Sequence, residues 1–318
     1  MLAATALSVV FLRDLFTIVM LFGIYSLLSA GFFVTMDAVD VALTEAAVGA
    51  GVTTVLMLGT LALTSRKEKI SRTPPSMIPL GVVVVTGLVL VYGTLDMPSL
   101  GDPDAPIHQH VAPRYIEQSY EEVGMPNIVT SVLASYRGYD TLGEVVVIFT
   151  AGLGVLTLLG IGGDDRHRVR PPEMAHHLVL RVISRAMIPL ILLYALYIQF
   201  HGDYGPGGGF QAGVIFGAAI ILYTMIFGLA KAEQLISPLF LRYMMGVGVL
   251  IYGGTGVLTL LLGGNFLDYD TLAHDPLHGQ HYGILAVELG VGITVTAVVI
   301  SIFFYFTGRG SQSGEDEQ

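Results

Sequence analysis

Long apolar runs, separated by polar segments, recur along the 318 residues of the chain. About 20 consecutive apolar residues are enough to cross a bilayer as an α-helix. Eight runs are this long: 14–35, 38–64, 77–95, 141–161, 180–199, 210–230, 240–263 and 281–306. The apolar segment 1–12 is too short to cross, so it forms half a helix or part of a ninth span. The pattern predicts an all-α, polytopic membrane protein with eight or nine transmembrane helices.

Composition agrees with this pattern and excludes other classes of protein. Hydrophobic residues make up 53% of the chain and charged residues 13%, against roughly 25% charged residues in a soluble domain. The 25 acidic residues outnumber the 15 basic ones, which argues against a nucleic-acid partner. The chain has no cysteine, so it has no thiolate ligands for a metal or an iron–sulfur cluster. We expect no cofactor, no metal and no enzymatic site in this chain.

The loops alternate in charge. Basic residues gather in the segments 65–76, 162–181 and 231–242, whereas the loops 96–140 and 264–280 are acidic. The positive-inside rule places the basic loops in the cytoplasm, together with the acidic tail 308–318. The N-terminus has no basic region and no clear cleavage site, so we expect no removed signal peptide. The protein is therefore expected to be a multi-pass protein of the cytoplasmic membrane, with a cytoplasmic C-terminus and a long acidic outer loop.

Part of that outer loop has a helical pattern. Apolar residues of 128–136 fall on one stripe of a helix. This stripe predicts a short helix that lies on the outer membrane surface or packs on another protein of the same complex.

Three glutamates fall inside predicted spans: Glu45, Glu144 and Glu288. A charged group at mid-bilayer costs about 2.5–3.5 kcal/mol on insertion scales, so each needs a reason. We interpret them as candidates for a proton or cation path, with Asp37 and Asp40 above Glu45. The alternative is that each glutamate hydrogen-bonds a neighbouring helix and only specifies packing.

Two of these glutamates share a local pattern. Glu45 is followed by Gly49 and Thr53, and Glu288 by Gly292 and Thr296. Spacings of four and eight residues place each set on one face of an α-helix. The glycine admits a neighbouring helix, and the threonine adds a hydroxyl one turn further in.

A glycine-rich hairpin joins the spans 180–199 and 210–230. Its sequence predicts a sharp reversal that gathers backbone N–H groups at the start of the next helix, shaped by Pro206, Gly207, Gly208, Gly209 and Phe210. His201 and Asp203 are candidates for proton access, because histidine titrates near neutral pH. The alternative is a tight turn in which the glycines matter only for shape.

Three histidines in another outer loop have spacings of four and three residues: His274, His278 and His281. Such a set can converge on a metal. Because Pro276 and Gly279 interrupt a regular ligand face, we favour a titrating surface loop.

Two motifs in the second half carry a family resemblance. The hairpin "HGDYGPGGGF" and the segment "LAVELGVGITV" resemble the MnhB/MrpB subunit of multisubunit Na⁺/H⁺ antiporters over residues 172–307. The family often has aspartate where this chain has Glu288. The resemblance implies that the hairpin and Glu288 belong to an ion-transporting subunit.

The first half, residues 1–165, resembles a second module, and the likeness covers nearly all of 14–161. The segments "VDVALTEAAVGAG" and "YRGYDTLGEVVVIFTAGLGVLTLL" are similar to the C-terminal region of the MrpA antiporter subunit. They are equally similar to the D and E membrane subunits of energy-converting hydrogenases, which are themselves related to the J-type subunit of respiratory complex I. This resemblance implies that Glu45 and Glu144 are candidates for the ion path.

The expected function is therefore a non-redox membrane subunit of an Mrp-type antiporter that moves Na⁺ against H⁺. The resemblance implies three kinds of partner: antiporter-like large subunits, a K-type small subunit and small Mrp-type subunits. The alternative is a membrane-arm subunit of a redox-driven, hydrogenase-type ion pump. A purely structural subunit is a third possibility. A self-sufficient transporter is disfavoured, because the halves do not look like inverted repeats.

Overall fold

The computed structural model describes residues 1–62, 64–68, 77–99, 101–159 and 177–309, and this part of the chain is mainly helical. It confirms the eight predicted spans: α2 (Leu15–Thr35), α3–η1–α4 (Val39–Glu45, Ala46–Thr53 and Thr54–Ala62), α5 (Met77–Thr94), α9 (Gly138–Leu159), α10 (Leu178–His201), α11 (Gly209–Phe227), α13 (Pro238–Leu261) and α14 (Pro276–Arg309). The N-terminal helix α1 (Leu2–Phe11) has ten residues, fewer than a membrane span needs. The described residues do not include most of the basic segments 65–76 and 162–181, or the tail from 310 onward.

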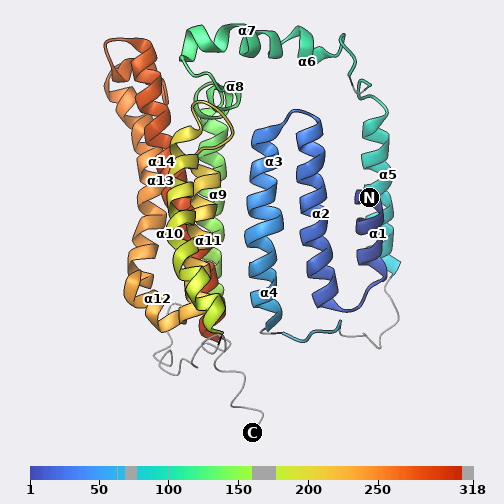
Figure 1. The fold of residues 1–318 in the computed structure, drawn as a ribbon. Helices are drawn as coiled ribbons and strands as arrows, with labels where there is room; N and C mark the ends of the chain where they lie inside the picture. Colours follow the sequence, from blue (N-terminus) through green and yellow to red (C-terminus); the bar gives the residue numbers. More distant parts are fainter. Residues whose placement is uncertain (63, 69–76, 100, 160–176, 310–318) are drawn as a thin grey trace.

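The spans other than α5 form two groups (Figure 1). In the first group, which we call the bundle, the helices α9, α10, α11 and α13 all contact the long helix α14. Its core includes Ile284, Val287 and Val295, all of which are almost completely buried. The second group consists of α1, α2 and the α3–η1–α4 span, and it meets the bundle mainly at α11. The helix α9, which belongs to the first predicted sequence module, thus packs in the bundle of the second.

Glycines allow α11 and α14 to pack backbone against backbone. Gly209, Gly213 and Gly217 recur every four residues, so they share one face of α11. A Cβ atom at Gly209 would lie 2.0 Å from the carbonyl oxygen of Glu288, and one at Gly213 would lie 2.8 Å from that of Gly292. Small residues allow the same close approach between membrane helices in general. These contacts fix the start of α11 against the middle of α14.

The short helices α6 (Pro106–Gln109) and α7 (Ala112–Val123) cross the top of the molecule in Figure 1, above the α10–α11 turn. We call this side of the molecule, where residues 202–208 lie, the hairpin end. The predicted helix at 128–136 forms as α8 (Ile128–Thr130) and η2 (Ser131–Tyr136). Its Thr130, Ser131 and Ala134 are buried, whereas its apolar stripe is largely exposed. Both interpretations of this segment, as a membrane-surface helix and as a partner contact, therefore stand as predictions.

Two short helices complete the bundle. The helix α12 (Leu229–Leu235) joins α11 to α13, and the 3₁₀ turn η4 (Tyr269–Leu272) packs on α14 at the hairpin end. In contrast, α5 stands apart from the bundle in Figure 1, and every one of its residues is exposed.

Candidate functional site

The hairpin between α10 and α11 is a tight reversal that only glycine fits at several positions. Gly208 has φ 113°, in the region that favours glycine, and its N–H donates to the carbonyl oxygen of Ile198 at 3.1 Å. A Cβ atom at Gly207 would lie 2.6 Å from the same carbonyl oxygen. The chain therefore turns back against the last turns of α10. Phe210 follows the turn and packs against the core around α14.

The outer segment before α8 holds this hairpin in place. Asn127 donates through Nδ2 to the carbonyl oxygens of Gly202 and Gly205, both at 3.0 Å. Thr130 donates through Oγ1 to the carbonyl oxygen of Gly202 at 2.6 Å. The sequence pattern pointed to neither residue. Asn127 could have been recognised as the N-cap of the following helix, because its side chain accepts from Val129 N–H.

Three carboxylates from three different elements converge beside the hairpin, and we call them the carboxylate cluster: Asp40, Asp203 and Glu288. Asp40, on α3, accepts from Gly207 N–H through Oδ1 at 3.2 Å. The Oε1 atom of Glu288 lies 3.1 Å from the position of a Cβ atom at Gly208. Both aspartates are close enough to interact electrostatically with Glu288. The structure thus brings together residues that are far apart in sequence.

Two histidines flank the carboxylate cluster. His281 Nδ1 lies 3.3 Å from Asp203 Oδ2, and His201 stacks on Tyr197 with ring centroids 4.8 Å apart. Burial raises the pKa of Asp203, and the nearby His281 partly opposes this by lowering the same pKa. A carboxyl with a raised pKa exchanges its proton closer to neutral pH.

Polar contacts continue from the cluster along α11. Gln211 donates through Nε2 to Thr44 Oγ1 at 2.8 Å and so joins α11 to α3. Thr296 donates through Oγ1 to the carbonyl oxygen of Gly213 at 3.1 Å. Thr296 therefore lies on the Glu288 side of α14, as its spacing predicts. Gln211 and Thr44 were missed, because neither is charged.

The other predicted residues lie elsewhere. Glu45 faces α2, since its Oε1 is 2.8 Å from the position of a Cβ atom at Gly49, beside Ser26. Glu144 is exposed on α9, and Asp37 is exposed in the turn between α2 and α3. Their roles in an ion path stay predictions, and the structure assigns none of the three to the carboxylate cluster.

The helix after Glu45 differs from expectation. Residues 46–53 form the π-helix η1 rather than a regular α-helix, so the spacing argument for Thr53, which assumed 3.6 residues per turn, does not apply. Alanines and glycines make up five of its eight residues and leave the backbone free to widen. Thr54 donates to the carbonyl oxygen of Gly49, five residues back, at 3.3 Å.

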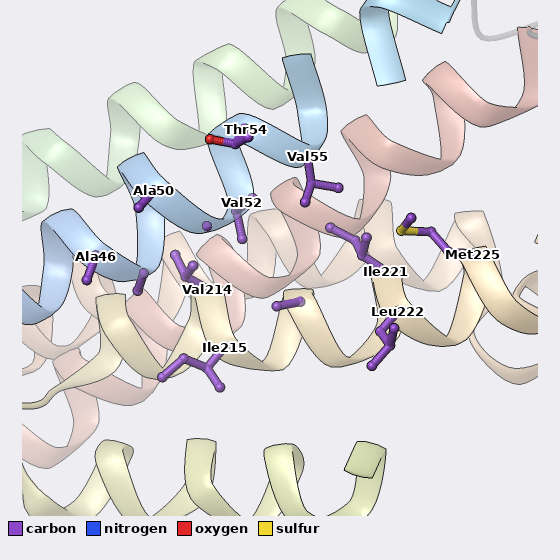
Figure 2. Close-up of a pocket in the computed structure, with 13 residues that line it drawn as sticks. Ala46, Ala50, Val52, Thr54, Val55, Val214, Ile215, Ile221, Leu222 and Met225 are labelled. Atoms are coloured by element: carbon purple, nitrogen blue, oxygen red, sulfur yellow. The ribbon is translucent and has the colours of Figure 1, made fainter. Parts of the chain in front are cut away.

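An apolar cavity of about 410 Å³ lies beside this π-helix (Figure 2). Its walls come from η1 and α4 on one side and from α11 on the other. Small side chains such as Ala46 and Ala50 form the first wall, and larger ones such as Ile221 and Met225 form the second. The two groups of spans therefore touch incompletely along α11.

The three histidines of the outer loop do not converge. His278 Nδ1 lies 3.0 Å from Asp275, whereas His281 faces Asp203. Within the described ranges, no group of three or more histidine, aspartate or glutamate residues is placed to hold a metal ion.

Family models match three consecutive parts of the chain. Residues 179–301 match a domain related to the MnhB subunit of Na⁺/H⁺ antiporters. Residues 1–66 match a model described as the D component of MBH, and residues 82–176 match one described as the E component of MBH.

A curated relative decides the family. The putative antiporter protein mnhB2 of Staphylococcus haemolyticus is 31% identical over 133 residues, which cover 94% of that protein and 41% of this chain. The chain belongs to the MnhB family. A second relative, the probable A/B component of a K⁺/H⁺ antiporter in Rhizobium meliloti, is 28% identical over 286 residues. That match covers 82% of this MnhB-family chain but only 28% of the length of the Rhizobium protein.

Solved structures extend the likeness to the whole fold. A chain of the Mrp complex from Dietzia sp. superposes with a TM-score of 0.75 and 28% identity, covering 96% of this MnhB-family protein and 34% of that chain. A chain of the archaeal membrane-bound sulfane sulfur reductase superposes with a TM-score of 0.56 and 30% identity. That match covers 72% of this chain and 96% of the reductase chain.

Proposed function

We propose that this protein is a non-redox membrane subunit of an Mrp-type cation/proton antiporter. The carboxylate cluster carries this proposal, because its three carboxylates, which are buried or half-buried, come from three elements and from both groups of spans. MnhB-family membership and the likeness to an Mrp complex chain support it. The cluster receives H⁺ from the outer side, and the exposed Glu144 and the α2-facing Glu45 serve other parts of the path.

The proposed setting follows from the spans and the loops. The protein lies in the cytoplasmic membrane with its C-terminus inside, and it binds antiporter-like large subunits, a K-type small subunit and small Mrp-type subunits. The exposed surface of α5 supports such contacts, since nothing in the described part of the chain packs closely on it. The two sequence modules, 1–165 and 172–307, are proposed to be a fusion of neighbouring subunits.

The test is exchange of Na⁺ against a pH gradient in vesicles that contain the whole complex. Glu288→Gln keeps the shape of the side chain but removes its titration, so we expect assembly to persist and exchange to fall at least tenfold. Glu117→Gln is the matched control, because Glu117 is an exposed acid of α7. If the Glu288→Gln variant exchanged Na⁺ and H⁺ at the wild-type rate, Glu288 would have only a packing role.

Two kinds of observation favour the redox-driven alternative: the matches to the D and E models of MBH, and the match that covers 96% of a sulfane sulfur reductase chain. Purification of the tagged protein from native membranes in mild detergent distinguishes the antiporter hypothesis from the redox-driven one. Antiporter subunits without metalloproteins support the proposal. Co-purified subunits with nickel–iron or iron–sulfur centres favour a redox-driven pump.

A further inference from the structure

Gln199, on α10, is a buried polar residue to which sequence analysis gave no role. Its side chain is 6% exposed, and its Nε2 atom has no hydrogen-bond partner among the described residues. The amide lies against α14, since a Cβ atom at Gly292 would be 2.6 Å from Gln199 Oε1. Gln199 therefore lies one helical turn further along α14 than Glu288.

A buried N–H group without a partner costs free energy and needs an explanation. The position of the amide suggests an explanation. Because Gly292 has no side chain, the amide of Gln199 reaches the face of α14 that carries Glu288. Residues four apart on a helix are neighbours on one face. A free N–H donor needs an acceptor oxygen and repels a bare cation, and the strongest acceptor on this face of α14 is the ionised carboxylate of Glu288.

We propose that Gln199 is a positioning residue for Glu288 and donates its Nε2 hydrogen bond, through one water molecule, to the ionised carboxylate. This inference rests on the proposed role of Glu288 in ion exchange. Donation to the charged form favours ionisation. The proton released by Glu288 leaves toward the hairpin end, and the amide stabilises the resulting negative charge until the next proton arrives.

Other charged and titratable groups face Glu288 and oppose or assist this effect. Asp40 on α3 and Asp203 in the hairpin disfavour a further negative charge through their electrostatic interaction with Glu288. The phenol of Tyr252 on α13 also interacts electrostatically with Glu288. His201 and His281 lie beside these two aspartates and offset their charge when protonated. Gln199 approaches from α10 and adds a donor that does not titrate.

The test is the variant Gln199→Met, which keeps the length of the side chain and removes its donor. We expect normal assembly, because the amide lacks a protein partner to lose. Without the donor, Glu288 needs a higher pH to ionise, so the half-maximal pH of Na⁺/H⁺ exchange should rise by about one pH unit. Thr224→Val is the matched control, since the buried Thr224 hydroxyl donates to Ile220 of its own helix at 2.7 Å.

Two results would overturn the inference. An unchanged pH profile in Gln199→Met shows that the amide does not act on Glu288. Failure of that variant to assemble shows that the amide has a structural partner. The Glu288→Gln variant separates this inference from the proposed function: if it abolishes exchange while Gln199→Met keeps the wild-type profile, only the role of Gln199 is wrong.

Discussion

The position of Glu288 depends on the absence of side chains around it. The Oε1 atom of Glu288 lies 3.3 Å from the position of a Cβ atom at Gly202 and 3.1 Å from that at Gly208. Its own carbonyl oxygen is the nearest atom to a Cβ atom placed at Gly209. A carboxyl inside the membrane can thus touch the backbone of the hairpin, where N–H groups and the start of α11 favour negative charge.

Gly209→Ala tests this close packing. The added Cβ atom would lie 2.0 Å from backbone rather than from a flexible side chain, so α11 and α14 must separate. We expect a loss of about 1–3 kcal/mol of stability, seen as a lower thermal midpoint of the purified complex. Gly254→Ala on α13 is the control, since its Cβ atom would meet nothing within 4 Å. Equal midpoints for the two variants would contradict the packing argument.

At the scale of elements, α7 is fastened to η2 by a polar contact. Tyr136 donates to Glu122 Oε2, and Arg114 Nη2 lies 3.0 Å from Glu122 Oε1. The Tyr136 hydrogen bond, and to a lesser extent Arg114, lowers the pKa of Glu122, although burial opposes them. Burial and Glu122 raise the pKa of Tyr136 to about 12. The contact therefore needs an ionised Glu122 and a neutral Tyr136.

The pH dependence of this contact follows from the sign of the shift. Because the pKa of Glu122 is lowered by folding, the stabilisation is complete above its ordinary value of 4.5 and is lost as pH falls through the lowered value. We expect proteolysis of residues 101–127 to accelerate well below pH 4.5 in intact vesicles. The variant Tyr136→Phe lacks the hydroxyl that donates to Glu122, so its residues 101–127 should be proteolysed at the fast rate at neutral pH as well. Equal rates at both pH values in the wild type would refute this attachment.

At the scale of the whole molecule, two groups of helices meet along α11. Polar contacts join them at the hairpin end, through Asp40 with Gly207 and Thr44 with Gln211. Further along α11, the apolar cavity beside η1 interrupts the packing between the two groups of helices (Figure 2). The carboxylate cluster therefore sits at the junction of the two groups, where a relative movement of the helices would reach it.

The proposed orientation can be tested with single cysteines, because the natural chain has none. Tyr204, in the hairpin, is exposed, and Ser65 is exposed in the connection after α4. In whole cells, we expect an impermeant maleimide to label Tyr204→Cys but to label Ser65→Cys only after permeabilisation. The opposite pattern would place the hairpin in the cytoplasm and overturn the inward position of the C-terminus.

The sequence alone determined the spans and the membrane class, because hydrophobicity over 20 residues is a local property that the bilayer enforces. It also singled out Glu288, Asp203 and the hairpin, since charge and glycine stand out inside apolar runs. It placed Glu45 and Glu288 in equivalent local patterns, yet the fold directs Glu45 toward α2 and Glu288 toward the hairpin.

Only the tertiary structure decided which residues meet. Asn127, Thr130 and Gln199 are polar residues without charge, and they gain importance through contacts with segments about 70 residues or more away. Such contacts depend on how helices rotate and approach each other, which packing of glycines against backbone fixes. The π-helix after Glu45 depends in the same way on its neighbours, because its small residues permit the widened turn but do not by themselves require it.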